Sequence, residues 1–340
     1  MRIKELDGLR GLAALSVVLF HYTNGSNPYF KEVFFFEFGH YGVELFFIIS
    51  GFVISLTLQR KKTFLEFWKA RFFRLFPIYW VCMTLTFVIT SLIGLDYMNR
   101  SFTEYILNAP MLSRFIGVKF VDGSYWSLQY ELFFYLIMAF IFYFLTKRLS
   151  KILLIFGLFT LVQFCINLTD FNTIMSNYGG LASTVYFRLY GIFILEYINL
   201  FTMGISLYAV VVEKKSWAWI YIIIGIIASA SISLEDFIAM IVIMGVLVSA
   251  LFLKWKIWRS RTMLWLGSIS YVLYLIHMFI GRSVIMYLID NGFFVYAAIA
   301  TATLLILALA TILTQFIEKP LFQILTRKKS RLNMPTRKHA

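Results

Sequence analysis

Two ionisable residues, Arg10 and His21, lie inside an apolar stretch near the beginning of the chain, 11 positions apart. That spacing is close to three helical turns, so on a helix both side chains project from one face, about 16 Å apart along the axis. Histidine is the usual group for proton transfer near neutral pH, and the arginine could hold an anion near the membrane surface. The pair therefore favours chemistry at a buried imidazole; the alternative is a snorkelling arginine and a histidine that only packs.

A second pair, Arg71 and Arg74, precedes Pro77, and this proline suits the first turn of a helix. Residues three positions apart share a helical face. Two guanidinium groups on one face can clamp a phosphate group, because each binds phosphate oxygens in a bidentate way. The alternative is that these arginines only anchor a membrane span on its cytoplasmic side.

Polar groups also lie in other apolar segments, where ionisable residues are costly and are candidates for function. Glu131 lies one turn inside the segment that begins Trp126-Ser127-Leu128. Its carboxylate could bind a hydroxylated substrate, orient a histidine or make an interhelical hydrogen bond. Ser270, Tyr274 and His277 share a helical stripe, which is more typical of packing and interface anchoring than of catalysis.

The remaining ionisable residues of the apolar segments do not suggest a chemistry. Glu318 comes before Lys319-Pro320, and the proline explains the end of a helix but not the carboxylate. Arg188, Glu196 and Arg282 have no motif around them, so we interpret them as structural.

The composition indicates what must position these residues. Of the 340 residues, 61% are apolar and 14% are charged, whereas soluble domains have about 45–50% and about 25%. A globule of this size has too little interior to bury so much apolar surface. The composition therefore excludes a soluble enzyme, a disordered chain and a secreted disulfide scaffold, and it indicates an all-α, polytopic membrane protein.

Apolar runs divide the chain into about ten segments that could cross the membrane, since a helix needs about 20 residues to do so. The sequence therefore predicts about ten transmembrane helices in a single integral membrane domain, 1–340, with a basic cytoplasmic tail at about 321–340. The break at about 96–125 is interpreted as a loop. The runs are 8–24, 41–58, 75–95, 126–146, 152–169, 184–212, 217–234, 236–253, 264–289 and 294–317.

The basic residues are concentrated in alternate breaks between these runs. Those breaks hold 24 of the 31 Lys and Arg residues. The positive-inside rule places them, and with them both termini, in the cytoplasm, which an even number of spans satisfies. The net charge of +14 then reflects topology, and no nucleic-acid partner is expected.

Taken in order, these motifs resemble those of the acyltransferase-3 family of membrane acyltransferases. Arg10 and His21 match its Arg/Lys-x10-His motif. The matches run in the right order from residue 6 to residue 320, so the resemblance covers nearly the whole chain. One departure is conservative, because many members carry Asp where this chain has Glu44. The other matching positions are Asp7, Glu44, Ser50, Arg71, Arg74, Trp126, Ser127, Glu131, Ser270, Tyr271, Tyr274 and Glu318.

The resemblance implies a membrane O-acyltransferase, and we expect O-acetyl transfer. His21 would be the catalytic base, with Arg10 needed as well, and Arg71 and Arg74 would handle the acyl donor. That donor would be acetyl-coenzyme A or another short acyl-coenzyme A from the cytoplasm, with no metal. The acceptor would be a hydroxyl of a carbohydrate or lipid-linked glycan, in a bacterial cell membrane. Some members carry a further extracytoplasmic hydrolase-like domain, and this chain is expected to act without one.

Coenzyme A has phosphates at one end and its thioester at the end of a long arm. Arg71, Arg74 and Arg10 could hold the phosphates at the cytoplasmic face while the arm reaches an imidazole about 16 Å deeper. Exclusion of water there protects the thioester from hydrolysis. We expect His21 to deprotonate the acceptor for direct attack, with Glu131 holding the acceptor or orienting His21. An acyl-enzyme is disfavoured, because no Ser or Cys lies in a recognisable nucleophile motif.

Two other classes of protein would also place ionisable groups at depth. A transporter or flippase for a polar or lipid-linked sugar is one alternative, although the sequence shows no repeat and none of its five prolines lies in mid-span. A membrane scaffold without chemistry is the other, but it leaves the spacing of Arg10 and His21 unexplained.

Overall fold

The computed structural model of the protein describes residues 3–24, 33–93 and 97–332, and the side chains of all of these except 93 and 326–332. Within these residues the chain is helical and has no strand, which confirms the predicted all-α class. By length and composition, six helices in this described part of the chain are candidates to cross a membrane, or seven if one sharply bent pair counts as a single span. The six are Glu37–Leu58, Phe64–Leu92, Gly123–Leu145, Leu149–Leu168, Leu234–Leu253 and Val295–Leu325.

The predicted count of about ten spans is not confirmed. Within the described residues each apolar run is largely helical, but α10 (Ile198–Val211) and α11 (Trp219–Ala230) have only 14 and 12 residues, fewer than the roughly 20 that a crossing takes. α1 (Lys4–Thr23) is 20 residues long, but its charged and polar side chains keep it outside the candidate spans. The basic tail lies partly outside the described residues, from 333 onward.

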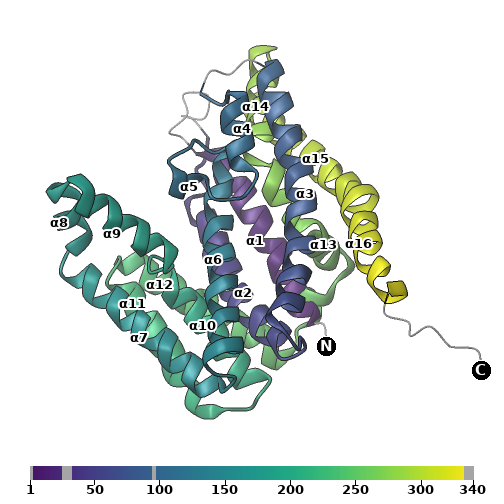
Figure 1. Cartoon of the computed structure of the whole chain (residues 1–340). Helices are drawn as coiled ribbons and strands as arrows, with labels where there is room; N and C mark the ends of the chain where they lie inside the picture. Colours follow the sequence, from purple (N-terminus) through teal and green to yellow (C-terminus); the bar gives the residue numbers. More distant parts are fainter. Residues whose placement is uncertain (1–2, 25–32, 94–96, 333–340) are drawn as a thin grey trace, which may run out of the picture.

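α1 runs through the middle of a bundle that holds the motif residues (Figure 1). It packs against α13 (Arg261–Ile276) and α2 (Gly42–Leu58), with α3 (Phe64–Ile93) and α6 (Trp126–Phe140) completing the bundle. A lobe projects from one side of the bundle in Figure 1, and α10 joins it to the bundle by packing on α2. Besides α10 and α11, the lobe contains α7 (Leu149–Leu168), α8 (Phe171–Tyr178), α9 (Gly180–Ile192) and α12 (Leu234–Leu253).

On the other side of the bundle lie α15 (Val295–Leu313), the short π-helical turn η7 (Thr314–Glu318) and α16 (Lys319–Leu332). The beginning of α1 and the end of α16 lie toward the same end of the molecule (Figure 1). The assignment of that end to the cytoplasm stays a prediction.

Glycines let α1 approach α13 closely. A Cβ atom on Gly267 of α13 would lie 2.0 Å from the Asp7 carbonyl oxygen, and one on Gly11 of α1 would lie 2.5 Å from the Gly267 backbone nitrogen. Small residues at a helix contact let two backbones come together in a membrane. This close packing fixes α1, and with it Arg10 and His21, against the helix that carries the Ser270–His277 stripe.

The predicted run 264–289 is not one straight helix. α13 ends at Ile276, α14 (Met278–Asp290) begins at Met278, and the two helices are bent by 75°. Kinks of this size occur where side chains insert into the backbone hydrogen-bond ladder. Here the Tyr22 hydroxyl donates to the His277 carbonyl oxygen at 2.8 Å, and the Tyr125 hydroxyl donates to that of Leu275 at 3.1 Å. The bend therefore depends on side chains that lie far away in the sequence.

The run 184–212 is also interrupted. α9 ends at Ile192 and α10 begins at Ile198, with Ile194 at a φ of 53° between them. A β-branched residue seldom adopts a positive φ, so this turn is held by its surroundings. The segment therefore forms two short helices where the sequence predicts one long run.

The described part of the break 96–125, residues 97–125, is not only a loop. It contains α4 (Phe102–Asn108) and α5 (Ser113–Ile116) before the turn η3 (Gly123–Tyr125). The buried Asn108 side chain joins its parts, because it donates to the Lys119 carbonyl oxygen at 2.9 Å and accepts from the Ser113 hydroxyl at 2.8 Å. This segment leads directly into α6 and carries Asp122, which is buried.

Candidate active site

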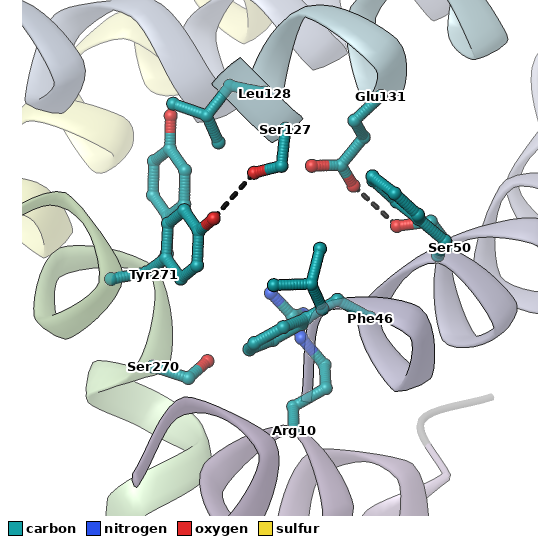
Figure 2. Close-up of a pocket in the computed structure, with 11 residues that line it drawn as sticks. Arg10, Phe46, Ser50, Ser127, Leu128, Glu131, Ser270 and Tyr271 are labelled. Carbon is teal, nitrogen blue, oxygen red and sulfur yellow. Dashed lines mark hydrogen bonds between the residues drawn. The ribbon is translucent and has the colours of Figure 1, made fainter. Parts of the chain in front are cut away.

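Two adjoining cavities lie within the bundle and share Arg10, Ser50, Glu131 and Tyr271. The Glu131 carboxylate and the Ser127 hydroxyl point into the space that the Arg10 guanidinium enters from the opposite side (Figure 2). The structure thus brings residues of α1, α2, α6 and α13 to one place. The first cavity is also lined by Val43, Phe46, Phe47, Ser127, Leu128, Ser270 and Tyr274, and the second by Ile49, Val53, Ile54, Arg71, Arg74, Leu75 and Tyr135.

Glu131 is held by two hydroxyl groups. The Ser50 hydroxyl donates to Glu131 Oε1 at 2.5 Å, and the Tyr135 hydroxyl donates to the same oxygen. Because both donors use Oε1, the second carboxylate oxygen has neither of them. Within the described residues no hydrogen bond joins Glu131 to His21, so the carboxylate faces the cavities without touching the histidine.

The arginine pair lines the second cavity together with Arg10. The predicted placement of Pro77 in the first turn of its helix is wrong: α3 begins at Phe64 and runs through the proline, so Arg71 and Arg74 lie on the helix itself. The start predicted from the sequence lies too late, because the apolar pattern of this helix begins only after its first, charged turns.

Arg71 is sandwiched between aromatic rings. Its guanidinium carbon lies 5.8 Å from the ring centre of Phe67 and 5.7 Å from that of Tyr135, and its Nη2 donates to the Thr57 hydroxyl at 3.0 Å. Its Nε is buried and has no hydrogen-bond partner in the described part of the chain. A buried guanidinium with an unused N–H is suited to bind an oxygen of a ligand that enters the cavity.

Arg74 has a different environment, which also explains Glu318. Arg74 Nη1 forms an ion pair with Glu318 Oε1 at 2.5 Å, and the Glu318 side chain is only 5% exposed. The sequence offered no role for Glu318, and the structure places it opposite the second arginine of the pair. Part of the positive charge predicted to bind phosphate is therefore already compensated.

A network of hydroxyl groups forms the wall at the other end of the first cavity. The Ser127 and Tyr274 hydroxyl oxygens lie 2.6 Å apart, and the Tyr274 hydroxyl also donates to the Ser124 carbonyl oxygen at 3.0 Å. Ser270 and Tyr271 bond to backbone carbonyls of Gly267 and Leu75, at 3.0 and 3.2 Å. The predicted Ser270–His277 stripe therefore lines the cavity as far as Tyr274.

His21 does not line either cavity. Its ring centre lies 5.2 Å from that of His277, and the His277 ring lies 5.5 Å from that of Tyr274. Three rings in contact thus connect the cavity wall to the predicted base. The continuous helix α1 carries both Arg10 and His21, and both side chains approach residues of α13 or its bend.

Three other motif positions, Asp7, Glu44 and Trp126, lie outside the cavities. The Asp7 backbone lies at the close contact with Gly267. Glu44 lies in the first turn of α2, and its Oε2 is buried without a hydrogen-bond partner among the described residues. Trp126 packs on the Tyr197 ring, with ring centres 5.6 Å apart. These residues position the helices and do not face the cavity.

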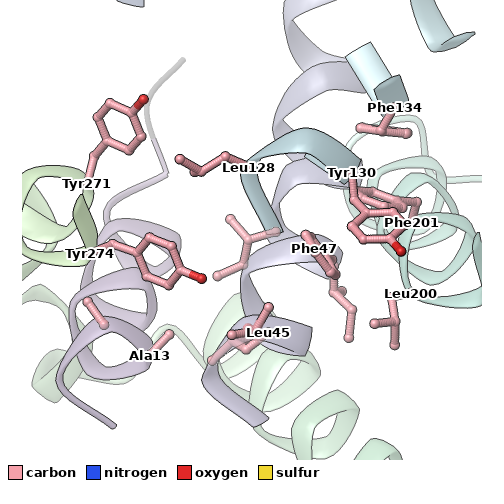
Figure 3. Close-up of a cluster of buried hydrophobic side chains, with 14 of the residues drawn as sticks. Ala13, Leu45, Phe47, Leu128, Tyr130, Phe134, Leu200, Phe201, Tyr271 and Tyr274 are labelled. Carbon is pink, nitrogen blue, oxygen red and sulfur yellow. The ribbon is translucent and has the colours of Figure 1, made fainter. Parts of the chain in front are cut away.

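An aromatic cluster supports the wall of the site (Figure 3). The rings of Phe134 and Phe201 stack with centres 4.1 Å apart, and Phe47 lies 5.0 Å from Phe201. These contacts join α6, α10 and α2, so the lobe braces the helices that carry Ser50 and Glu131. Aromatic pairs of this kind add about 0.5–1.5 kcal/mol each beyond the burial of their area.

Sequence reasoning missed several polar residues around His21. The Arg282 Nε, interpreted as structural, donates to the His21 carbonyl oxygen at 3.0 Å. The buried Asp122 accepts from the Phe279 backbone N–H at 2.9 Å and so caps the start of α14. The one signal that could have found Arg282 is its ionisable type inside an apolar run, because the bend that brings these groups together leaves no mark in the local sequence.

The arrangement combines cations at one end of the cavities with hydroxyl groups and imidazoles toward the other. Such a site can bind an anionic ligand and move a proton. Among the residues that the structure describes, no group of three or more His, Cys, Asp or Glu side chains could hold a metal ion.

Comparison with known proteins gives several similarities. The O-acetyltransferase OatA of Staphylococcus aureus (strain NCTC 8325 / PS 47) is 33% identical over 96 residues, which are 25% of this chain and 14% of that protein. The O-acetyl transferase of Shigella phage Sf6 is 29% identical over 144 residues, which are 38% of this chain and 43% of that protein. The chain therefore matches less than half the length of either relative. No solved structure matches it.

The family comparison covers far more of the chain. The acyltransferase-3 model, described as an acyltransferase domain, matches residues 3–316, which include every motif position above except Glu318. The apolar helices of the structure agree with membrane embedding. The chain therefore belongs to the acyltransferase-3 family of membrane acyltransferases.

Proposed function

We propose that this protein is an O-acetyltransferase of the bacterial cell membrane that moves an acetyl group from acetyl-coenzyme A to a hydroxyl of a carbohydrate or lipid-linked glycan. The names of the two relatives support O-acetyl transfer. The observation that carries the proposal is that Arg10 lines one cavity with Arg71 and Arg74 and the adjoining cavity with Ser127 and Tyr274. An anion-binding end and a hydroxyl-lined end thus adjoin.

The cations of the second cavity bind the phosphates of the donor in this proposal. Arg71 has an unused buried Nε, and Arg10 has no ion pair among the described residues, whereas Arg74 is paired with Glu318. Arg71 and Arg10 therefore supply the charge that is free to meet a phosphate, and the Glu318 ion pair holds Arg74 beside them. The acetyl-bearing arm then extends along the Tyr271 and Tyr274 side of the cavities.

The chemistry needs one proton to be moved twice. His21 takes the proton of the acceptor hydroxyl while its oxygen attacks the acetyl carbonyl carbon, so that a C–O bond forms. The C–S bond of the thioester then breaks, and the proton returns from His21 to the leaving sulfur. Arg10, a cation that lines both cavities, holds the donor in place during this step. No Ser or Cys nucleophile is required.

Glu131 holds the acceptor in this proposal. Its Oε1 is occupied by Ser50 and Tyr135, and its second oxygen faces the shared cavity opposite Arg10. A carboxylate fixed in this way can accept a hydrogen bond from a sugar hydroxyl. We retain both termini in the cytoplasm and a single domain over 1–340 as parts of the proposal, since the donor comes from that side.

The test uses purified full-length protein in lipid vesicles with radiolabelled acetyl-coenzyme A. We expect saturable binding and transfer of label to an O-ester. Comparison of surface glycans from cells with and without the gene would identify the acceptor as the sugar that loses one acetyl ester. A protein that binds no acetyl-coenzyme A but moves a sugar across the vesicle would instead be a transporter, and one that does neither would be a scaffold.

A further inference from the structure

His21 and His277 form a pair that the chemistry above does not use. Their ring centres lie 5.2 Å apart with an angle of 41° between the ring planes. His21 comes from the last turn of α1 and His277 from the bend between α13 and α14. His277 is fully buried. Two imidazoles from distant parts of the chain are therefore packed together next to Tyr274, which lines the first cavity.

The hydrogen bonds of His277 determine where its proton lies. Its Nδ1 is 2.8 Å from the Tyr274 carbonyl oxygen. A carbonyl oxygen only accepts, so Nδ1 carries the hydrogen, and in the neutral ring the lone pair is on Nε2. That Nε2 is buried and has no hydrogen-bond partner among the described residues.

His21 also has a ring nitrogen without a hydrogen-bond partner. Its Nδ1 is also buried without a partner in the described part of the chain. Buried polar atoms are nearly always hydrogen-bonded, so two unsatisfied nitrogens on neighbouring rings are unusual. One ring offers a lone pair and the other can offer an N–H, which is the combination that a hydrogen bond requires.

The backbones of the two histidines are fixed independently of their rings. The Tyr22 hydroxyl holds the His277 carbonyl at 2.8 Å, and the Arg282 Nε holds the His21 carbonyl at 3.0 Å. Asp122 holds the Phe279 N–H two residues after His277. Hydrogen bonds therefore hold the main chain on both sides, while His21 Nδ1 and His277 Nε2 have no partner among the described residues.

The distance between the rings suits a direct hydrogen bond. A nitrogen lies about 1.1 Å from the centre of an imidazole ring, so two rings joined by a bond of about 2.9 Å have centres about 5.1 Å apart. The observed 5.2 Å matches this value. A hydrogen bond between the two nitrogens requires the rings to turn toward each other, and catalytic hydrogen bonds often tighten only when substrate binds.

We propose that His277 is a positioning residue for His21. Its Nε2 accepts the Nδ1–H of His21, which places the His21 lone pair on Nε2, where it takes the proton of the acceptor hydroxyl. His277 itself neither gains nor loses a proton, so the transfer stays as written above. This inference rests on the proposed function only for the role of His21 as base, because the pairing of the two rings is a structural statement in its own right.

Two substitutions at one position separate this role from a structural one. His277→Asn keeps a donor at the place of Nδ1, next to the Tyr274 carbonyl, and removes the group at Nε2. His277→Gln places an amide oxygen near Nε2 and gives up the Nδ1 contact. We expect His277→Asn to lower kcat by at least about tenfold with KM for acetyl-coenzyme A unchanged, and His277→Gln to keep much more of kcat. If Asn retains as much kcat as Gln, the proposal is wrong.

A second measurement keeps the test valid if both variants are inactive. The chain has four histidines, so the ¹⁵N spectrum of the full-length protein with labelled histidine is simple to assign from His21→Gln and His277→Gln spectra. We expect wild-type His21 to be protonated at Nδ1 and bare at Nε2, and this preference to be lost in His277→Asn. A wild-type His21 with its proton on Nε2 would overturn the pairing.

The same experiment distinguishes the two proposals. Transfer activity that survives in His21→Ala would remove His21 as the base and leave the ¹⁵N result on the ring pair unaffected. Activity lost in His21→Ala but normal in both His277 variants, with their acetyl-coenzyme A binding intact, would overturn the role of His277 and leave the proposed function standing.

Discussion

The Arg10 end and the His21 end of α1 differ in where their polar groups find partners. Near Arg10, several side chains pair with one another: Arg74 pairs with Glu318, and Ser50 donates to Glu131, while Arg71 Nε has no partner among the described residues. Near His21, hydrogen bonds hold the backbone, and His21 Nδ1 and His277 Nε2 are left without a partner among the described residues. The first arrangement distributes charge over several residues, as binding an anion requires. The second fixes two rings and leaves their nitrogens for protons, so single substitutions should have larger effects there.

The largest effect is expected for His21→Ala. Removal of the base should lower kcat for acetyl transfer by about 100-fold to 10,000-fold, because that is what a positioned general base contributes. Binding of acetyl-coenzyme A should change little, since His21 lies outside both cavities. Radiolabel transfer and equilibrium binding on the same preparation check both parts. Normal transfer by a correctly inserted variant would contradict the base assignment and the contrast between the two ends.

Arg71→Gln should have the next largest effect, and on binding instead of turnover. Loss of a charge-assisted contact of about 1.5–3 kcal/mol should raise KM for acetyl-coenzyme A by roughly 10-fold to 100-fold, with a smaller change in kcat. Arg71→Lys should rescue only part of the effect, because an ammonium group cannot stack between Phe67 and Tyr135 or bind two oxygens at once. A large fall in kcat at unchanged KM would place Arg71 with the chemistry and erase the difference between the ends.

Sequence reasoning reached the helical class, the family and the motif residues, because these depend on local composition and spacing. The Arg71–Arg74 spacing is an example: two residues three positions apart share a face wherever the helix begins. The placement of Pro77 in the first turn is wrong, because the charged turns before the apolar run also belong to α3, which begins at Phe64.

The contacts that distinguish the two ends could not be predicted from the sequence. Glu318 lies 244 positions from Arg74, and Asp122 lies 157 positions from Phe279. Neither distance leaves a periodic signal, and the apolar run 264–289 gives no sign of the 75° bend at His277. The predicted number of spans is not confirmed either, because apolar runs do not show where a helix inside a membrane protein breaks.

Asp122→Asn should reduce stability by about 1–3 kcal/mol. Asp122 is fully buried and accepts from the Ser124 N–H, the Ser124 hydroxyl and the Phe279 N–H. An amide group must turn its NH₂ toward at least one of these donors, so that one of them loses its acceptor. We expect a lower Tm in detergent and a loss of kcat that follows from displacement of His277. Unchanged Tm would mean that other contacts hold the bend.

Glu318→Gln should have a smaller effect on stability, about 1 kcal/mol, because Arg74 is 39% exposed and water can compensate part of the lost ion pair. The variant keeps a hydrogen-bond acceptor beside Arg74 and frees its charge. We therefore expect KM for acetyl-coenzyme A to stay the same or fall, in contrast to the rise in Arg71→Gln. A rise of tenfold or more would show that the ion pair itself shapes the phosphate site.

Arg114→Gln should have the smallest effect and serves as the matched control for Arg71→Gln. Arg114 Nη2 lies 3.5 Å from Glu196 Oε2, and the two side chains are 47% and 36% exposed. An exposed pair of this kind contributes less than about 0.5–1 kcal/mol, so Tm, KM and kcat should all stay close to wild type. Arg114 is also outside both cavities, and its loss changes the net charge by the same amount as the loss of Arg71. If both variants raised KM equally, the effect of Arg71 would come from the overall charge of the protein. The Arg10 end would then not be a specific anion site.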